Sequence, residues 1–570
     1  MPVSRNPADS VGPRLRAGLV STLVAFTGAC GGGGSGGSEG GGTLPAPNVT
    51  ISGQVSFDRV LPSANFDGGL DFGNMPRAPA REVVVEVLRA DRSVFASTLT
   101  NVEGRYSVAA PANAEVTVRV RAQTRSQGTA SRPATWNLRV LDNTDGNAVY
   151  AIEGSLSGTG ATDQVRDLHA ASGWTGSSYG RPRAAAPFAV LDTLYAALQL
   201  AVSADGNTRF PDLDVYWSPR NRSSPQFRPT LGEIVTTSYR SIVDDPAQGG
   251  IYVQGLEDVD TDEYDAHVIA HEFFHFIEDV VTRSDTPGGK HSLVEKLDLR
   301  LAFSEGFGNA WAAMVVGSPL YRDSYGSRQG RSFHFDVEDN EWASFGRMDG
   351  WYNEVSVQAV LYDLFDADTD GADSIALGIA PLYAVLRDEL RRGAALTTLF
   401  AFTAGLERQP AVPVSGLRAL LAEQDIGRGV PEPDAFGTGE RNSGGNPDAL
   451  PVYLTLELNG PAVPACTSVR DGFDNKLGNR RLLGFELAQE RRVEIEVRSS
   501  DGGSPAPDPD LVIYRAGRLA SSETVTPFVE RYAGDLAAGR YVLEVYEYTH
   551  VDPDATLRRP RTCMNVSITG

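Results

Sequence analysis

The sequence lacks a concentrated block of basic residues after its first residues. Its 51 Lys and Arg are outnumbered by 73 Asp and Glu, which gives a formal net charge of −22. Nucleic acids and anionic lipid surfaces attract proteins through clustered Lys and Arg, so the sequence argues against both as binding partners. The acidity otherwise bears on solubility and on cation binding, and it does not indicate a type of reaction.

Cysteine is also scarce, with three residues in the whole chain. Cys30 follows an apolar stretch near the N-terminus, so only Cys466 and Cys563 remain for the folded part. Two cysteines in an exported chain can pair, and this pair would close a large loop that contributes roughly 3–5 kcal/mol to stability. Two buried free thiols are the alternative.

The apolar stretch near the N-terminus is too short to span a membrane as a helix. Residues 17–27 are uncharged and mostly apolar, and arginines precede them, which is typical of an export signal. The segment 1–29 resembles a bacterial lipoprotein signal. That resemblance implies a lipid on Cys30 that attaches the protein to the outer membrane or cell surface, with the Gly/Ser-rich residues 30–47 as a flexible tether. A plain secretory signal with a chance cysteine is the alternative.

A chain of 570 residues is too long for one hydrophobic core, and roughly 100–200 residues per domain predict three or four folded units. Residues 48–155 contain short runs with apolar residues at every second position, which predict β-strands. Residues 180–434 show mainly helical spacing and predict an α+β unit. Residues 451–570 return to short strands, and residues 435–450, rich in Gly and Asn, are the predicted linker.

Both strand-rich segments resemble known domain families. In the first, ISGQV is followed by VEVLRAD and NVEGRYSV, and this order resembles the transthyretin-like (carboxypeptidase regulatory-like) β-sandwich. In the last, DPDLVIY is followed by LAAGRYVLEV, which resembles the pre-peptidase-like β-sandwich found after the catalytic domains of many secreted bacterial peptidases. We expect two β-sandwiches that flank the central unit, and we assign no chemistry to the first.

The central segment carries two histidines and a carboxylate in the pattern His-Glu-x-x-His. His271 and His275 are four residues apart, so on a helix their imidazoles share one face and can reach one zinc ion at roughly 2.0–2.1 Å. Glu272 lies about 100° around the helix, where it can contact water at the metal without ligating the ion. The surrounding apolar residues predict a buried helix, whose histidines need polar partners. Two hydrogen-bonded core histidines are the alternative to a metal site.

A second segment, LAFSEGFGNAW, places Glu305 thirty residues after His275, at what we expect to be the opening of an apolar helix. The two segments together resemble the gluzincins, the thermolysin-like zinc peptidases and aminopeptidases. This resemblance implies that zinc is bound by His271, His275 and Glu305, and that Glu272 is the catalytic carboxylate. Asn309 stands where thermolysin-like enzymes have an Asp that orients a ligand histidine.

The resemblance also implies a mechanism. Zinc with three protein ligands leaves a position for water, and Glu272 takes a proton from that water and delivers it to the leaving amine of a peptide or protein substrate. Gly250–Gln254 is the expected edge strand for an extended substrate. The residue that stabilises the oxyanion is left open among Tyr352, Tyr325 and His334.

Other polar residues near the motif have alternative roles. His267 lies four residues before His271 on the same helical stripe, and it could replace Glu305 as the third ligand; a core histidine or a residue that supports a ligand is the expected role. Glu278 and Asp279 are expected to face solvent or to support a ligand.

Two acidic runs could bind cations. Asp366–Asp373 resembles the first half of a calcium loop, although Leu377 stands where such a loop has Glu, and a solvated acidic turn is the alternative. Asp258, Asp260 and Asp262 alternate in a similar way, and we expect them to cap the helix that carries the histidines.

The sequence therefore predicts a multidomain chain with an N-terminal β-sandwich, a central α+β zincin-like catalytic domain and a C-terminal β-sandwich. The favoured function is a surface-anchored zinc metallopeptidase, with Zn²⁺ as cofactor and Ca²⁺ left open. The first alternative is a catalytically inactive, zinc-containing binding or adhesive lipoprotein, which the bulky Phe273 and Phe274 inside the motif would favour. A hydrolase of non-peptide amides is the second.

Overall fold

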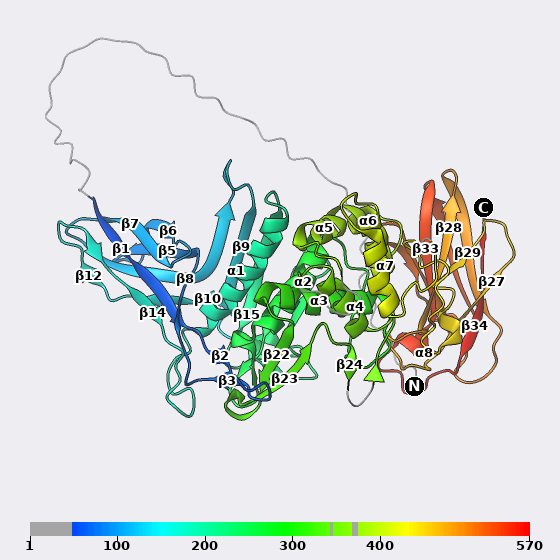
Figure 1. The fold of residues 1–570 in the computed structure, drawn as a ribbon, viewed down its shortest axis with the longest axis horizontal. Coiled ribbons are helices and arrows are strands. Elements are labelled where there is room, and N and C mark those ends of the chain that lie inside the picture. The colour runs from blue at the N-terminus through cyan, green and yellow to red at the C-terminus, as the bar shows by residue number, and fades with distance from the viewer. Residues whose placement is uncertain (1–47, 343–345, 368–373, 432) are drawn as a thin grey trace, which may run out of the picture. The chain divides into compact units, whose positions relative to one another are not determined.

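The computed structural model describes most of the chain, namely residues 48–342, 346–367, 374–431 and 433–570. The described residues belong to one compact unit, 47–570. The predicted signal 1–29, Cys30 and the tether 30–47 lie outside the described residues, as do Asp368–Asp373 of the predicted calcium loop. The described part is rich in β-sheet, with a group of helices in the middle of the chain (Figure 1).

The first sheet is built around β1 (Asn48–Asp58), in which apolar and polar residues alternate as predicted. Val49, Ile51, Val55 and Phe57 are buried on one face. The strand pairs antiparallel with β4 (Arg77–Pro79) and β7 (Arg105–Pro111), and parallel with β13 (Gln164–Val165) and β14 (Leu168–Ala170). The buried face belongs to the same hydrophobic core as the second sheet.

The second sheet has ten strands and crosses the predicted boundary between the N-terminal and central units. Its main path follows the order β18 (Ser238–Arg240), β19 (Gly250–Val253), β15 (Arg209–Trp217), β9 (Thr135–Asp142), β8 (Glu115–Gln127), β5 (Val83–Arg89) and β6 (Val94–Leu99). Strand β9 pairs in parallel with β15, and Leu138 and Val140 lie beside Leu213 and Val215 in a fully buried register. Residues 48–155 are therefore not a separate sandwich, because their sheet continues into the central unit.

The parallel pairing of β9 with β15 needs a crossover connection, and α1 (Ala186–Ala204) lies in it. This helix packs against α2 (Ala266–Val280), which in turn packs against α3 (Leu299–Val316), followed by α4 (Glu354–Asp363) (Figure 1). Further helices follow in α5 (Ile379–Ala384), α6 (Leu399–Glu407) and α7 (Val414–Glu423). The helical stretches predicted from the sequence are present.

The bounds of the two central helices differ from the prediction. Helix α2 begins at Ala266, because the chain from Asp262 to Tyr264 forms a separate 3-10 turn and Asp265 is the first residue outside the helix. Helix α3 begins at Leu299, where the Asp298 side chain accepts a hydrogen bond from the backbone N–H of Arg300. Glu305 consequently lies in the second turn of α3 and does not open the helix.

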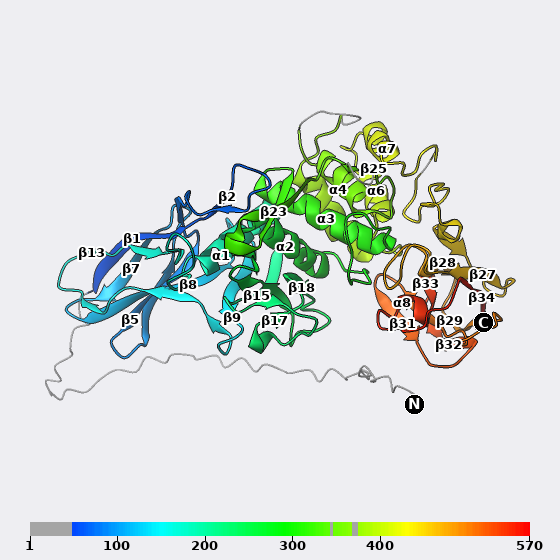
Figure 2. The ribbon, with the colours of Figure 1, turned by 90° about the horizontal axis from the view of Figure 1, so that it is seen from below.

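A small four-stranded sheet lies beside the central helices. It has the order β20 (Gly255–Leu256), β21 (Asp260–Thr261), β22 (Leu320–Tyr325) and β23 (Arg331–Asp336). Strand β21 precedes α2 and β22 follows α3 along the chain, and the two strands pair, so the sheet ties together the two segments that enter and leave the pair of helices. Figure 2 labels β23 of this sheet and the helices α2 and α3 in the green central part of the chain.

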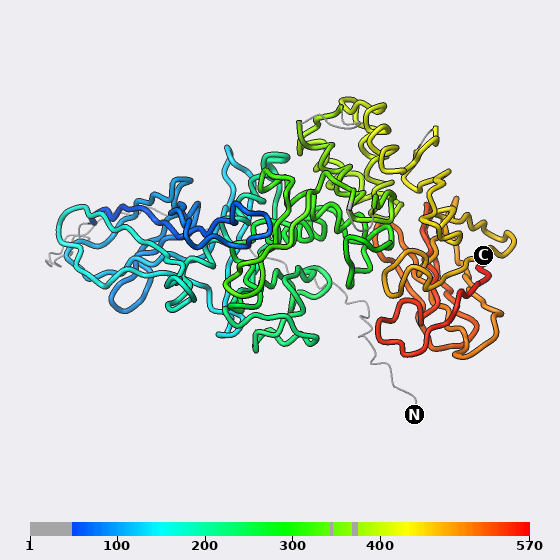
Figure 3. The backbone as a smooth tube through the Cα atoms, turned by 60° about the horizontal axis from the view of Figure 1, so that its bottom comes forward, coloured from blue at the N-terminus to red at the C-terminus, as the bar shows by residue number. Residues whose placement is uncertain are grey.

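The C-terminal residues form a β-sandwich, as predicted, with a hydrophobic core of its own. One sheet has the order β26 (Tyr453–Thr455), β28 (Arg480–Leu487), β33 (Gly539–Glu547), β30 (Pro509–Tyr514) and β31 (Arg518–Ser522). The other has the order β27 (Val463–Thr467), β34 (Thr562–Thr569), β29 (Arg491–Ser499) and β32 (Val529–Leu536). These strands, coloured orange to red, form a group of their own in the backbone trace (Figure 3).

A buried arginine connects this sandwich to α3. The Arg300 guanidinium donates to Glu544 of β33 at 2.7 Å and to the Asp298 carboxylate at 2.9 Å. The predicted linker 435–450 also contacts the helical part: Trp351 Nε1 donates to the carbonyl of Asn442 at 2.9 Å. The linker is therefore packed against the fold, because its polar backbone groups find partners there.

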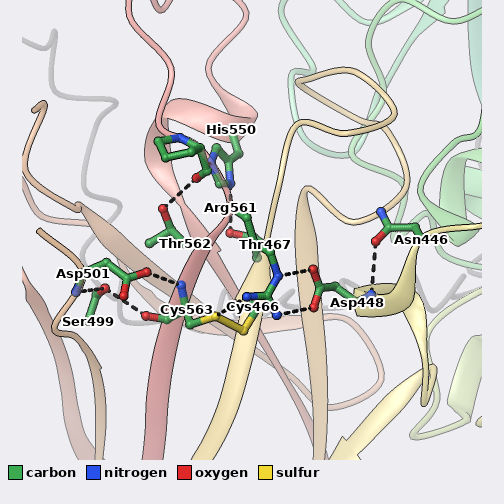
Figure 4. Close-up of a disulfide and its surroundings, with 11 residues drawn as sticks. Asn446, Asp448, Cys466, Thr467, Ser499, Asp501, His550, Arg561, Thr562 and Cys563 are labelled. Carbon is green, nitrogen blue, oxygen red and sulfur yellow. Dashed lines mark hydrogen bonds and ion pairs between the residues drawn. A yellow bond between two sulfur atoms is a disulfide. The ribbon is translucent and has the colours of Figure 1, made fainter. Parts of the chain in front are cut away.

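Cys466 and Cys563 form a disulfide, which confirms the predicted pairing. The two residues are directly opposite each other on the antiparallel strands β27 and β34 (Figure 4). The backbone around them is held by Asp501, which accepts from the Cys563 N–H at 2.8 Å. Arg561 donates to the Asp448 carboxylate at 2.6 and 2.7 Å and so ties the end of the linker to the sandwich.

Replacing both cysteines with serine is expected to destabilise the C-terminal sandwich. The two residues are 97 positions apart, and a loop of that size is worth up to about 4–5 kcal/mol through the entropy of the unfolded chain. Urea unfolding of the oxidised wild type and of the double variant measures the difference. Added reductant should lower the midpoint of the wild type and leave the double variant unchanged; equal midpoints for the two oxidised proteins would contradict the prediction.

Candidate metal centre

The structure brings the side chains of His271, His275 and Glu305 together, with one ligand atom of each within 4.8 Å of the others. His271 Nε2 lies 3.1 Å from Glu305 Oε2 and 3.1 Å from His275 Nε2. His275 Nε2 lies 3.5 Å from the same carboxylate oxygen. The two histidines project from one face of α2 and Glu305 from the facing side of α3, so the helix pair alone assembles the group.

The opposite nitrogen of each imidazole is held by a further polar residue. His271 Nδ1 lies 2.9 Å from Asn309 Oδ1, and the Asn309 amide donates to Gln358 Oε1 at 3.0 Å, which fixes the orientation of the amide. His275 Nδ1 lies 3.3 Å from Ser304 Oγ. Because both Nδ1 atoms have partners, both Nε2 atoms remain available to a metal. Asn309 thus has the orienting contact expected from its position, without a charge.

Glu278 supports the second histidine. Its carboxylate accepts from Ser304 Oγ at 2.6 Å and lies 3.7 Å from His275 Nδ1, and its side chain is buried. The structure therefore places Glu278 with the residues that support a ligand. Asp279, the next residue, accepts from the Tyr239 hydroxyl at 2.6 Å.

Two glycines of α3 allow the close approach of the neighbouring helices. A Cβ atom on Gly308 would lie 2.7 Å from Cε1 of His271. A Cβ atom on Gly306 would lie 2.8 Å from the side chain of Val357 on α4. A larger residue at Gly308 would push α2 away from α3, and one at Gly306 would push α4 away. The close approach of the three helices therefore requires these glycines.

The donor set fits zinc. Two imidazole nitrogens and one carboxylate oxygen converge from a buried wall, and this combination is one of the common protein ligand sets of catalytic zinc. Burial would raise the pKa of Glu305, but the nearby His291 and His275 hold it well below its usual range. The carboxylate is therefore ionised, as a ligand has to be.

Glu272 lines the same cleft and stays outside the group of ligands. Its Oε2 accepts a hydrogen bond from the backbone N–H of Tyr239 on β18 at 2.6 Å. Burial raises the pKa of the Glu272 carboxyl, against the opposing effect of His271 and His275. A carboxylate with a raised pKa beside a metal site is well suited to accept a proton.

The cleft contains residues that the sequence did not reveal. It encloses about 700 Å³. His291 lines it with Nε2 at 3.3 Å from Glu305 Oε2 and Nδ1 at 3.1 Å from Glu354 Oε2. Tyr321 also lines it, with its ring edge-on to His271 at a centroid distance of 6.4 Å. No local motif marks these residues, because loops and a hairpin outside the two motifs bring them to the site.

The three residues considered for the oxyanion do not line the cleft among the residues that the structure describes. The Tyr352 hydroxyl is 2.9 Å from the carbonyl of Asp349 and 3.0 Å from Asn442 Oδ1, which directs it toward the linker. Tyr325 lies at the end of β22 and is 41% exposed, and His334 lies on β23. The structure therefore does not favour any of the three for this role, which the sequence left open among them.

His267 is a core histidine, as expected, and one further expectation changes. His267 is buried outside the group of ligands, with Nε2 at 3.4 Å from the carbonyl of Ser318, and burial lowers its pKa to about 4. Gly250–Gln254 is not an edge strand, because β19 lies between β15 and β18. The edge is β18, whose Ser238 and Tyr239 line the cleft.

Comparison with known proteins relates the chain to peptidases. Residues 234–388 match the family described as Mycolysin C-terminal domain. This range contains α2, α3 and all the residues of the candidate metal centre. The match covers less than half of the chain, and no curated protein matches the sequence.

Several solved structures match parts of the chain. They include the pre-peptidase C-terminal domain of collagenase from Bacillus anthracis, with 13% identity over 20% of this chain and 93% of that one, at a TM-score of 0.16. The periplasmic lysozyme inhibitor PliG of Aeromonas hydrophila shows 14% identity over 20% and 96% of the two chains, at a TM-score of 0.14. These TM-scores are too low to bear on fold or function.

Gly308→Ala is expected to weaken metal binding without changing a ligand. The added methyl group would lie 2.7 Å from the His271 ring, so the ring or helix α3 has to shift and the three ligands no longer converge. Zinc affinity, measured by competition with a chromogenic chelator, should fall by roughly 10–100-fold, as for other changes around metal ligands.

Gly206→Ala is the matched control. Its added Cβ would find the nearest atom 4.0 Å away, so this variant should bind zinc like the wild type. Unchanged zinc affinity in Gly308→Ala would contradict the role assigned to the close helix packing.

Proposed function

We propose that the chain is a zinc-dependent peptidase of the gluzincin type, with zinc bound by His271, His275 and Glu305. The observation that carries the proposal is the convergence of these three ligand atoms in the cleft that also holds Glu272. The match of residues 234–388 to a peptidase-related family supports it independently. Zinc bound there would lower the pKa of water to about 7 and polarise the carbonyl group of the scissile bond.

Glu272 is the proposed general base and acid. The Tyr239 N–H holds one of its carboxylate oxygens, which leaves the other to take a proton from water and to pass it to the leaving amine. The raised pKa of this carboxyl brings it closer to neutral pH, where proton transfer in both directions is efficient.

Strand β18 is the proposed binding edge for the substrate. It is the last strand on the main path of the ten-stranded sheet and its residues line the cleft beside Glu272. An extended peptide can add to such an edge through backbone hydrogen bonds, which favours a polypeptide over a small amide as substrate.

Tyr321 is the proposed donor to the oxyanion. It lines the cleft, and its ring lies edge-on to His271. Burial raises the pKa of its phenol, so the hydroxyl keeps its proton and can donate to the oxygen on which charge develops.

Phe273 and Phe274, whose bulk was an argument for an inactive binding protein, do not line the cleft. Both rings are fully buried, and Phe274 stacks on Phe307 of α3 at a centroid distance of 4.4 Å. They pack the helices together and leave the cleft open. The lipid on Cys30 and the location at the outer membrane or cell surface stay predictions from the sequence.

Glu272→Gln is expected to abolish peptidase activity and to keep zinc. Loss of a general base costs about 10²–10⁴-fold in kcat/KM, while the three ligands are untouched. The measurement is the cleavage of a broad peptide library. It compares the wild type with zinc, the wild type with chelator, and the variant with zinc. If the variant binds one zinc and the wild type cleaves no peptide, the zinc-containing binding protein is the better description.

Tyr321→Phe is expected to lower kcat by about 10²–10³-fold, as the loss of one oxyanion donor does, with little change in KM or zinc content. Tyr325→Phe and Tyr352→Phe are matched controls, since neither hydroxyl lines the cleft, and both should retain kcat. A normal kcat in Tyr321→Phe would assign the role to another group, of which His291 lies nearest to the ligands.

A further inference from the structure

A second group of possible ligands lies in the wall of the same cleft. Asp260, Asp262 and Asp323 each place a carboxylate oxygen within 4.8 Å of the other two. Asp260 comes from β21, Asp262 from the 3-10 turn that follows it, and Asp323 from β22. The three residues are brought together by the small sheet and share no ligand with the zinc group.

Several oxygens in this group are buried without a partner. Asp262 is 2% exposed, and its Oδ1 accepts no hydrogen bond; Asp260 Oδ1 is unpartnered in the same way. The amide oxygens of Gln254 and Gln329 are also buried and unpartnered, and both side chains contact the Asp260 carboxylate. Buried polar atoms of native proteins nearly always have a partner, so these oxygens point to a missing one.

A positive partner would suit this group of carboxylates. Burial, together with repulsion among the acidic groups, raises the pKa of Asp262 well above its ordinary range and that of Asp323 to about 7. Among the ion pairs of the described residues, none involves Asp260, Asp262 or Asp323, although lysine and arginine side chains pair with many other carboxylates. A bound cation would satisfy the oxygens and offset the repulsion at the same time.

The expected role of these residues as helix caps does not account for them. Helix α2 begins at Ala266 and its N-terminus receives no side-chain hydrogen bond. Asp262 Oδ2 instead accepts from Thr237 Oγ1, which aims the carboxylate toward β18 and the cleft. The Asp258 carboxylate accepts from the backbone N–H of Arg328 and lies outside the group.

We propose that Asp260, Asp262 and Asp323 bind a calcium ion, with the amide oxygens of Gln254 and Gln329 completing its shell. Calcium takes six to eight oxygen ligands at about 2.3–2.6 Å, and this group offers oxygens alone, whereas zinc prefers the nitrogen-containing group next to it. Oxygens within 4.8 Å of one another suit a single ion.

The ion would link the chain before α2 to the strand that carries Tyr321. Asp262 lies four residues before the helix of His271, and Asp323 lies two residues after Tyr321. Calcium would thus hold both walls of the cleft in place. This consequence depends on the proposed peptidase function, whereas calcium binding itself does not.

The test is a calcium titration of the full chain in the zinc-loaded Glu272→Gln background, where self-cleavage cannot interfere. Isothermal calorimetry and thermal unfolding measure the same event. We expect one calcium site and, at calcium 100-fold above its dissociation constant, a rise in unfolding temperature of roughly 2–3 °C. Asp262→Asn combined with Asp323→Asn should abolish both. Retained zinc stoichiometry and far-UV circular dichroism verify that this variant is folded.

Two control variants separate this site from other acidic residues. Asp535→Asn removes an exposed carboxylate from the C-terminal sandwich, and Asp370→Asn alters the predicted calcium loop Asp366–Asp373. Both should bind calcium at this site like the background protein. Calcium binding that survives the double substitution, or that is lost only in Asp370→Asn, overturns the proposal.

Peptide cleavage in the active background provides a further outcome. If the double substitution leaves calcium binding intact and removes a preference for Lys or Arg next to the cleaved bond, the acidic group is a substrate pocket and the proposal is wrong. If the wild type cleaves no peptide but its unfolding temperature still rises with calcium, the peptidase function is contradicted and the calcium site is not.

Discussion

The close contact between α2 and α3 is the constraint on which the candidate site depends. Gly308 lies directly against the His271 ring, and Phe274 stacks on Phe307 at a centroid distance of 4.4 Å with nearly parallel planes. The aromatic pair fixes how the helices face each other, and the glycine fixes how near they come. These two contacts bring the imidazoles of His271 and His275 on α2 next to the Glu305 carboxylate on α3, and no loop is needed for this arrangement.

The rest of the fold supports this helix pair from two sides. On one side, Glu263, which lies just before α2, forms a buried ion pair with Arg183 and accepts a hydrogen bond from Trp217 Nε1 of β15 at 3.3 Å, so this part of the chain is held against the sheet. On the other, the Arg300 guanidinium at the start of α3 is enclosed by Asp298 and Glu544, so the C-terminal sandwich fixes the beginning of that helix. Breaking a buried pair by removing one partner typically costs 3–5 kcal/mol, because it leaves an unpaired charge. Distant parts of the chain therefore set the geometry of the site.

Local sequence patterns predicted much of this arrangement. The four-residue spacing of His271 and His275 predicted two imidazoles on one face of a helix, and the resemblance to gluzincins pointed to Glu305 as the residue that would meet them. The alternation of apolar residues gave the strands of both strand-rich segments. It could not show that β9 pairs with β15, because alternation reports which face of a strand is buried and not which strand lies beside it.

The residues that were missed share a physical reason. His291, Tyr321 and Asp323 are carried to the cleft by segments far from both motifs in sequence, so no spacing rule connects them to the ligands. Tyr352 was one of three candidates for the oxyanion, yet its hydroxyl donates to Asn442 of the linker, a contact that only the tertiary fold reveals. Glu272 and Asn309 were found because each lies on the same helix as a ligand.

Zinc stoichiometry of the purified full chain tests the central claim most directly. Elemental analysis after dialysis should give one zinc per chain for the wild type and for His267→Ala, and well below one for Glu305→Ala, because Glu305 is the only one of these side chains in the group with His271 and His275. A full equivalent of zinc in Glu305→Ala, together with its loss in His267→Ala, would contradict the ligand set on which this account depends.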